Sequence, residues 1–295
     1  MTKELQEIIR AVEGRPGEVF ALATLVRTQG SSYRRPGARM LIATDGSYLG
    51  ALSGGCLEEE VAARAQQVIA SGTPTTMRFD TRRRYGCNGA IDIFIEKLPL
   101  AFLRGIAEAI EARRICFAAT DSLGSRLVGS IVEAPADAFV QEIEPPLQLL
   151  LVGEGPDSPA LRAFAQTLGW KVVEADGAVA LPNELDEWTA AIVKTHNYGR
   201  DFAALQKLLP LGLRYVALLG PRRRRDQLLH ALADAGVERR SELFAPAGLD
   251  LRAESPEQIA LAMVAEIQSV FAGGKAESLR QRKSPIHLVP DLAVA

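Results

Sequence analysis

Two cysteines in glycine-rich turns are the residues of this chain best suited to chemistry. Cys56 lies in the segment SGGCLE (residues 53–58) and Cys87 in the segment YGCNG (residues 85–89). Small neighbours let a backbone or a ligand approach a side chain, whereas a core cysteine needs bulky apolar neighbours. Cys56 also precedes an acidic run that reads as the first turn of a helix, and a helix N-terminus favours the thiolate, which attacks electrophiles and binds soft metals.

Two other interpretations of these cysteines stay open. They could be small apolar side chains at tight turns, although two such sites close together in the chain favour a chemical role. They could also form a reversible redox pair in a regulatory protein. The third cysteine, Cys116, has the apolar neighbours of a buried strand residue and is expected in the core.

The composition indicates a globular protein with two domains. The chain has 295 residues, of which 47% are hydrophobic and 24% charged, and its net charge is −2. This balance gives no global signal for nucleic acid or for an anionic membrane surface. No segment approaches the ~20 apolar residues of a membrane span, and the N-terminus resembles an amphipathic helix and not a signal peptide. Three cysteines do not suggest a disulfide framework, so we expect a cytoplasmic protein.

The first half of the chain predicts an α+β domain, residues 1–140. Apolar alternation and turn signals predict strands interspersed with a few helices. The expected strands are 19–27, 39–44, 48–52, 74–80, 90–97, 114–120 and 126–133, and the expected helices are 57–70 and 101–112. Residues 134–146 contain three prolines and several acids, and periodicity lapses there, so we expect a linker.

The second half, residues 146–295, predicts a Rossmann-like, doubly wound parallel sheet. Apolar strands at 147–152, 171–175, 190–194 and 214–219 alternate with helices at 159–168, 200–209 and 222–235, which is the pattern of such folds. A long helix should follow up to Phe271, with Ser255 as its N-cap and Pro256 at its first position. The overall fold class is therefore α/β.

The turn GEGPDS (residues 153–158) stands where a dinucleotide fingerprint belongs. Gly153 permits a tight turn, and Gly155 would let the backbone approach a phosphate at the helix N-terminus. Asp176 ends the next strand, at the place of a ribose-binding acid. Ser158 replaces the third glycine, and Pro156 removes one N–H, so the fold is indicated more strongly than NAD(P) binding.

Two further candidates follow later strands of this half. His196 comes just after the third strand, at the edge where open parallel sheets bind ligands. Arg222 begins a run of four arginines that opens a helix. Part of such a run must be solvated, and the remainder could meet phosphate as bidentate donors.

Several segments together resemble the XdhC/CoxI family, the accessory proteins of molybdenum hydroxylases such as xanthine dehydrogenase and carbon monoxide dehydrogenase. The N-terminal half contributes GSSYRRPGARM (30–40), SGGCLE (53–58) and GCNG (86–89). The C-terminal half contributes THNY (195–198), LGPR (219–222), PAGLD (246–250), SPEQIA (255–260), AEI (265–267) and SPIH (284–287). The resemblance extends over nearly the whole chain. Departures such as Glu154, Asn88 and Leu251 concern the subfamily, and so the client enzyme.

The resemblance implies a chaperone that binds the molybdenum cofactor, holds it in the sulfurated state and delivers it to an apo molybdenum hydroxylase of the xanthine, carbon monoxide or aldehyde dehydrogenase type. It implies no catalytic residue. A cysteine desulfurase and a second copy of the chain are further candidate partners, and a cleft between the two domains could open to release the cofactor. The alternative, from another class, is an NAD(P)-dependent oxidoreductase that acts on the cofactor or on a small substrate.

The residue chemistry fits this expectation. Molybdenum with sulfur ligands is soft and matches cysteine thiolate, while the pterin phosphate calls for arginines and helix N-termini. The expected metal ligands are Cys56 and Cys87. The residues expected to shape the cofactor pocket beside them are Arg34, Arg39 and Glu58, and those expected to bind the cofactor or a nucleotide on the Rossmann side are Gly153, Gly155, Asp176, His196 and Arg222.

Overall fold

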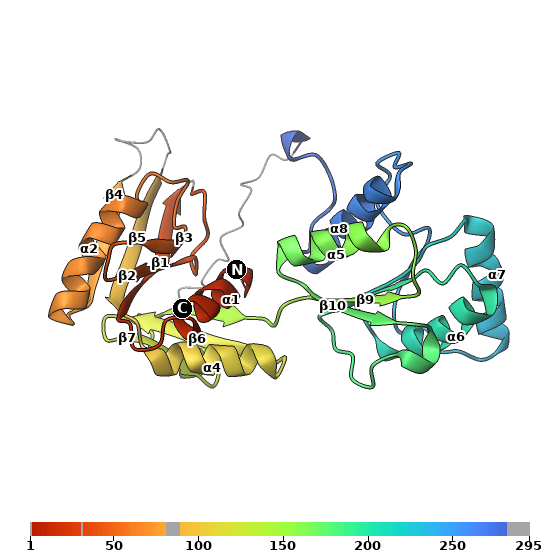
Figure 1. Ribbon diagram of the computed structural model, residues 1–295, viewed down its shortest axis with the longest axis horizontal. Helices are drawn as coiled ribbons and strands as arrows, with labels where there is room; N and C mark the ends of the chain where they lie inside the picture. The colour runs from red at the N-terminus through yellow and green to blue at the C-terminus, as the bar shows by residue number, and fades with distance from the viewer. Residues whose placement is uncertain (1, 31, 81–88, 282–295) are drawn as a thin grey trace. The chain divides into compact units, whose positions relative to one another are not determined.

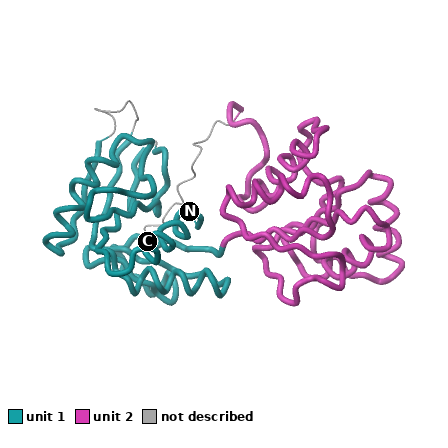
Figure 2. Tube along the Cα trace, viewed as in Figure 1, with its two compact units in different colours: residues 1–145, 282–295 teal, residues 146–281 magenta. Residues whose placement is uncertain are grey.

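A computed structural model describes residues 2–30, 32–80 and 89–281 (Figure 1). The chain divides into two compact units, the first containing residues 1–145 and the second residues 146–281 (Figure 2). Each unit has its own hydrophobic clusters, so each is described by itself.

A five-stranded antiparallel sheet forms the centre of the first unit. Its order is β3-β2-β1-β5-β4, and its strands are β1 (Phe20–Gly30), β2 (Arg39–Ala43), β3 (Tyr48–Gly50), β4 (Thr75–Asp80) and β5 (Gly89–Lys97). Strand alternation sends successive side chains to opposite faces. Helix α2 (Glu58–Ser71) covers one face, whereas α1 (Thr2–Glu13) and α4 (Leu100–Glu111) pack on the other.

A second, three-stranded antiparallel sheet completes this unit. It contains β6 (Cys116–Asp121), β7 (Gly124–Val128) and β8 (Phe139–Ile143), with β6 in the middle. The linker predicted over residues 134–146 is therefore wrong over β8, which pairs with β6 along its whole length. The strand predicted over 126–133 ends at Val128 and gives way to a short 3₁₀ turn, Ile131–Glu133.

The second unit is the predicted doubly wound sheet, and all its strand pairs are parallel. The order is β10-β9-β11-β12-β13, formed by β9 (Gln148–Val152), β10 (Lys171–Ala175), β11 (Thr189–Val193), β12 (Tyr215–Leu218) and β13 (Leu243–Phe244). Helices α5 (Ser158–Leu168) and α8 (Pro256–Phe271) cover one face, and α6 (Tyr198–Leu208) and α7 (Arg222–Asp234) cover the other (Figure 1). The predicted fold class is confirmed.

Strand order fixes where this sheet can bind ligands. The chain leaves β9 to form β10 on one side and then crosses back to form β11 on the other. In open parallel sheets, the crevice at such a switch point, outside the carboxyl ends of the strands, is the usual binding place. The loops after β9 and β11 are therefore the expected binding loops of this unit.

Candidate functional site

Cys56 lies in an open turn directly before α2. Its side chain is exposed, and Leu57 separates it from the first residue of the helix. Gly55 has a φ of +100°, which L residues rarely adopt, and a Cβ added at Gly54 or Gly55 would meet nothing within 4 Å. The turn therefore leaves room beside the thiol for a bulky ligand.

The Glu58 side chain stabilises the turn that carries Cys56. Its buried carboxylate accepts hydrogen bonds from the N–H groups of Leu52 (3.0 Å), Ser53 (2.8 Å) and Leu57 (3.0 Å), and also from the Ser53 hydroxyl (2.8 Å). The Ser53 oxygen in turn accepts from the N–H of Cys56 (3.1 Å). Glu58 therefore holds the backbone around Cys56 in place, and its donors lie within the turn itself.

These hydrogen bonds also keep Glu58 ionised. Burial alone would raise the pKa of this carboxyl, but the hydrogen bonds from Ser53 and Leu57 outweigh it, so the pKa is lowered. A carboxylate at the first position of a helix also interacts favourably with the helix dipole. The site thus combines an exposed soft thiol with a rigid, negatively charged support below it.

Arg34 and Arg39, both predicted beside Cys56, lie elsewhere in the first unit. Arg34 is half-buried, and its Nη2 donates to both carboxylate oxygens of Glu4 in α1, at 2.5 and 2.6 Å. Arg39 lies in β2, whose alternate residues Met40 and Ile42 pack with α2. Its own side chain lies on the opposite face, over the ring of Phe102 in α4. The structure therefore does not bring either guanidinium to the Cys56 turn.

Arg39 is a buried structural cation. Its Nη1 donates to Gln141 Oε1 of β8 (2.5 Å) and to the carbonyl of Gly37 (3.2 Å). Among the described residues, its Nε and Nη2 have no hydrogen-bond partner. Burial lowers the pKa of Arg39 to about 10, although the negative charge of Glu96 acts in the other direction. Arg39 thus ties the two sheets of the first unit together.

The other two cysteines are Cys87 and Cys116. Cys87, the second predicted metal ligand, lies outside the described residues. Cys116 is half-buried in β6 and packs against the α1 and α4 cluster, close to its predicted core role. Burial raises the pKa of the Cys116 thiol.

In the second unit, the predicted glycine turn follows β9. Gly153 has a φ of +93°, and a Cβ there would lie 2.7 Å from the Cα of Thr195, so only glycine fits between the loops after β9 and β11. A Cβ added at Gly155 would lie 3.4 Å from both His196 Nε2 and Lys194 Nζ. The loops that carry Gly155 and His196 therefore do converge at the switch point.

Lys194 and Asp157, which sequence reasoning missed, are buried charged residues of these two loops. The Lys194 side chain is fully buried, its ammonium lies 3.5 Å from Asp157 Oδ2, and it donates to the Ser158 hydroxyl. That hydroxyl accepts from the N–H of Gly155 at 3.1 Å. The only hint in the sequence is a lysine placed at the end of an apolar strand, which otherwise reads as a solvated strand end.

The loop after β11 is anchored by a second buried acid. Asp201 in α6 accepts from the hydroxyl (2.5 Å) and the N–H (3.2 Å) of Thr195, and it pairs with Arg224. His196 follows with a φ of +54°, an uncommon conformation for a residue other than glycine, and its side chain is exposed. The tertiary structure therefore presents the imidazole to solvent at the switch point.

The last two predicted residues lie at the same edge of the sheet. Asp176 follows β10, is highly exposed and pairs with Arg200. Arg222 is the first residue of α7 and is exposed. Of the four arginines in this run, Arg224 pairs with buried Asp201 and Arg225 donates to the carbonyl of Ala245. The run therefore divides into structural and solvent-facing members.

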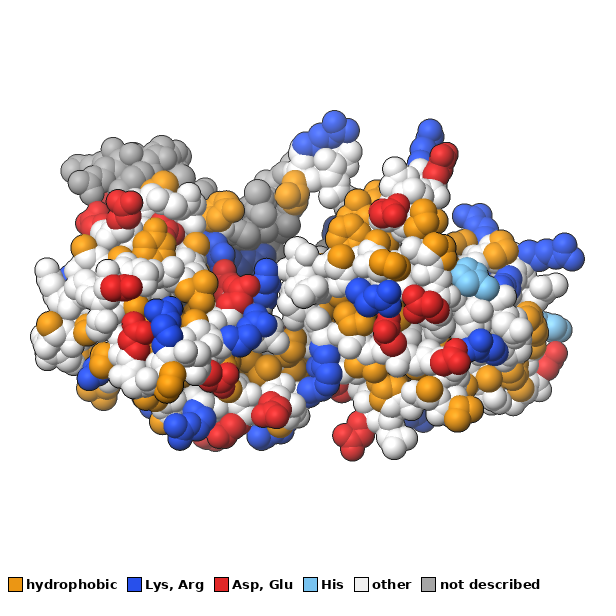
Figure 3. Space-filling model, viewed as in Figure 1, with side chains coloured by type: hydrophobic (Ala, Val, Ile, Leu, Met, Phe, Trp, Pro, Cys, Tyr) orange, Lys and Arg blue, Asp and Glu red, His pale blue; other side chains and the backbone are white. Residues whose placement is uncertain are grey.

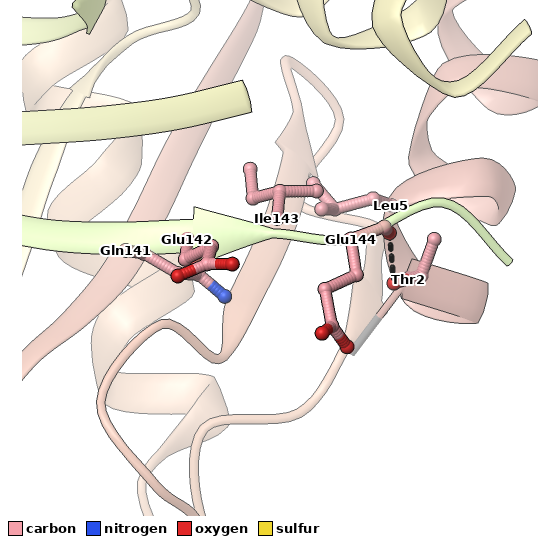
Figure 4. A pocket seen from close by; sticks show the side chains of 6 residues that line it. All are labelled: Thr2, Leu5, Gln141, Glu142, Ile143 and Glu144. Carbon is pink, nitrogen blue, oxygen red and sulfur yellow. Dashed lines mark hydrogen bonds between the residues drawn. The ribbon is translucent and has the colours of Figure 1, made fainter. Parts of the chain in front are cut away.

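A pocket of about 370 Å³ lies in the first unit, and one of its lining residues is Gln141, which accepts a hydrogen bond from Arg39. It is formed by the start of α1 and the end of β8, where the Thr2 hydroxyl donates to the carbonyl of Glu144 at 3.0 Å (Figure 4). The side chains of Gln141, Glu142 and Glu144 line it together with Leu5. The described residues that line it include no thiol and no cation.

Two features of the described residues bear on metals and membranes. No group of three His, Cys, Asp or Glu side chains there is gathered in a way that could hold a metal ion. No helix in that part of the chain has the length and apolar character needed to cross a bilayer. On the face shown in Figure 3, acidic and basic side chains are interspersed over each unit.

Comparisons with known proteins agree with this division into two parts. Residues 15–80 match the XdhC and CoxI family, and residues 149–267 match the XdhC Rossmann domain. A crystal structure described as a xanthine dehydrogenase from Bacillus halodurans shares the fold, with a TM-score of 0.79 at 24% identity over 93% of this chain and 98% of that one.

Two curated relatives match over most of their length. One is a Bacillus subtilis protein described as a probable xanthine dehydrogenase subunit, which is 30% identical over 85% of this chain and 92% of the relative. The other is the "Molybdenum cofactor insertion chaperone PaoD" of Escherichia coli, which is 27% identical over 92% of this chain and 90% of the relative. The chain therefore belongs to the XdhC and CoxI family.

Proposed function

We propose that this protein is an insertion chaperone that binds the molybdenum cofactor and delivers it to an apo molybdenum hydroxylase of the xanthine dehydrogenase type. Two relatives that match this chain over most of its length support this role. One is named for insertion of the molybdenum cofactor, and the other is named for xanthine dehydrogenase. In this proposal the protein carries the cofactor and does not itself catalyse a reaction.

The exposed Cys56 thiol is the observation that supports the proposal most directly. A chaperone needs a soft donor that a bulky sulfur-ligated metal can reach, and the open glycine turn provides one. The support from Glu58 lets the thiol meet its cargo without first ordering a flexible loop. We propose Cys56 as one thiolate that contacts the molybdenum or its sulfido ligand, with Cys87 as the second.

The proposed role has three further elements. The cargo is the sulfurated cofactor, which makes a cysteine desulfurase the expected sulfur donor. A second copy of the chain is the expected partner in a homodimer. His196 and Arg222, both exposed at the switch-point edge of the second unit, are the groups proposed to meet the phosphate end of the cofactor.

Metal analysis of cysteine variants tests the proposal. Wild-type protein, Cys56→Ser and Cys116→Ser should be purified from a host that makes the cofactor, and molybdenum and pterin measured per folded protein. We expect Cys56→Ser to lose most of the bound molybdenum while its circular dichroism stays unchanged. Cys116→Ser, which removes a half-buried thiol from the same unit, should retain it.

The opposite pattern would overturn the assignment of Cys56. Wild-type retention by Cys56→Ser would show that this thiol does not contact the cofactor. Loss of molybdenum from both variants would point to a general effect of sulfur removal on the fold. Delivery is tested separately, by adding loaded protein to an apo-hydroxylase and following the activity that appears.

A further inference from the structure

Sheets with the fold of the second unit often bind a dinucleotide, and Gly155 is where such a ligand would approach. In sheets of this kind the pyrophosphate rests over the second glycine of the turn, at the N-terminus of the following helix. Negative charge is favoured there because free N–H groups and the helix dipole point at it. Whether this chain can accept a dinucleotide therefore depends on what lies above Gly155.

The side chain of Asp157 already occupies that space. A Cβ added at Gly155 would lie only 2.7 Å from Asp157 Oδ1, so the carboxylate rests directly over the glycine. Asp157 is 3% exposed and is the N-cap residue of α5, yet its side chain makes no capping hydrogen bond. An acid here is placed as a bound anion would be.

Lys194, the cation that could bind a phosphate at this position, already pairs with Asp157. Lys194, at the carboxyl end of β11, is 0% exposed, and its ammonium lies 3.5 Å from Asp157 Oδ2. It also donates to the hydroxyl of Ser158, the residue that stands in place of the third glycine of the fingerprint. Removing this cation from its partner would leave a buried charge unpaired, which is strongly unfavourable.

Few backbone N–H groups of the turn are available to a phosphate. The N–H of Gly155 donates to the Ser158 hydroxyl at 3.1 Å, Pro156 has none, and the N–H of Ser158 donates to the carbonyl of Gly155 at 3.0 Å. A pyrophosphate would find few free donors and would meet a fixed carboxylate at close range.

We propose that the Asp157 carboxylate is a resident anion in the pyrophosphate position of this sheet, and that the second unit consequently binds neither NAD(H) nor NADP(H) in the manner of its fold. Lys194 pairs with the carboxylate there, and the Ser158 hydroxyl accepts a hydrogen bond from the same ammonium. The inference concerns the position over Gly155 and does not depend on the proposed role of Cys56, and it leaves the exposed side chains of His196 and Arg222 accessible to a ligand.

Titration of the full-length protein tests this inference. NADH and NADPH binding should be followed by fluorescence, and inorganic pyrophosphate binding by calorimetry, on wild type, Asp157→Asn and Glu154→Gln. Glu154 is the matched control because it is an exposed acid of the same turn, 69% exposed at its side chain. Its replacement removes one negative charge from the turn and leaves the pair of Asp157 and Lys194 in place.

We expect wild type and Glu154→Gln to show no dinucleotide binding up to about 1 mM. Asp157→Asn should bind pyrophosphate at least about tenfold more tightly than wild type, because Lys194 loses its carboxylate partner. This gain should weaken with added salt.

Two results would overturn the inference. One is micromolar NADH or NADPH binding by wild type that pyrophosphate displaces. The other is that folded Asp157→Asn and the smaller Asp157→Ser, which also clears the space over Gly155, both bind pyrophosphate no better than wild type. Should one variant fail to fold, the other repeats the test, and the wild-type titration tests dinucleotide binding without either variant.

Discussion

At the scale of single residues, the candidate site separates the side chain that would meet the ligand from the one that positions it. Cys56 is exposed and has open space beside it. Glu58 is buried, and its carboxylate accepts hydrogen bonds from Leu52, Ser53 and Leu57. The segment SGGCLE thus contains both functions within six positions. Replacing Glu58 should therefore act on stability first, and on cofactor retention only through the turn.

Glu58→Gln should lower the free energy of unfolding by about 1–3 kcal/mol at pH 7, because an ionised acceptor of four donors is replaced by a neutral amide. The folded-state pKa of Glu58 is lowered, so its contribution is present above the unfolded pKa of about 4.3 and is lost as the pH falls through the folded pKa. Urea denaturation at pH 7 and near pH 3 measures both effects.

Glu59→Gln provides the control, since Glu59 is an exposed acid in the same helical turn. An equal loss in the two variants would mean that helix-dipole charge, and not the turn, accounts for the effect. A difference between wild type and Glu58→Gln that stays constant down to pH 3 would contradict the assigned pKa direction.

Arg222→Ala should weaken cofactor binding by the protein and reduce the dependence of that binding on salt, because an exposed cation at a helix N-terminus attracts anions. Arg223→Ala, the exposed neighbour, is the matched control. Cofactor retention measured at two salt concentrations distinguishes them. If Arg222→Ala changed neither cofactor binding nor its salt dependence, Arg222 would have no role in binding the cofactor.

At the scale of elements, strand alternation decides which predicted residues can meet. Odd and even residues of β2 face different layers, so Met40 packs with α2 whereas Arg39 lies over Phe102 of α4. The family resemblance predicts Arg39 near Cys56, because both residues lie in motifs of the N-terminal half. A resemblance carries residue types and order, but the faces of this sheet follow from the register of β1 and β2.

Arg39→Met should therefore destabilise the first unit by about 1–3 kcal/mol while leaving molybdenum retention per folded molecule unchanged. The Gln141 amide oxygen would lose its buried donor, and the interior charge of Glu96 would lose its opposite charge. Arg104→Met, on the exposed side of α4, should change neither quantity. If Arg39→Met kept its fold but lost as much molybdenum as Cys56→Ser, the result would show that Arg39 contributes to cofactor binding.

Regular alternation made most elements predictable, and its interruption explains the failures. The run at 171–175 and the Ser255 cap of α8, which forms a capping box with Gln258, were predicted closely. Strand β8 was missed because prolines and acids surround a five-residue segment whose pairing partner, β6, is distant in sequence. Lys194 was missed for a similar reason, since its partner Asp157 meets it only once β9 and β11 are side by side.

At the scale of the whole molecule, the two units have separate cores, and the last strand of the first unit ends only a few residues before the second begins. The hydrophobic clusters of residues 2–145 share no member with those of residues 146–281. The boundary of the first unit therefore lies after β8, and not at residue 140 as the sequence suggests.

A fragment of residues 1–145 should consequently be more stable than one of residues 1–140, which loses Gln141 and Ile143 from the edge of the three-stranded sheet. We expect a melting temperature several degrees higher for the longer fragment, because Ile143 is 3% exposed and packs in the core. Residues 146–281 should unfold cooperatively alone. Circular dichroism melting of the three fragments would show whether the end of β8 matters, and equal melting of the two N-terminal fragments would refute it.

The unequal exposure of Cys56 and Cys116 has a practical consequence for handling and tagging the protein. An alkylating reagent at neutral pH should modify Cys56 well before Cys116, whose thiol is half-buried and held protonated by its surroundings. A spin label or fluorophore could thus be attached at the edge of α2 once Cys87 has been replaced. Of the two described thiols, Cys56 is also the one that air would oxidise first, so preparations without a reductant should lose the proposed capacity to load cofactor before any sign of unfolding.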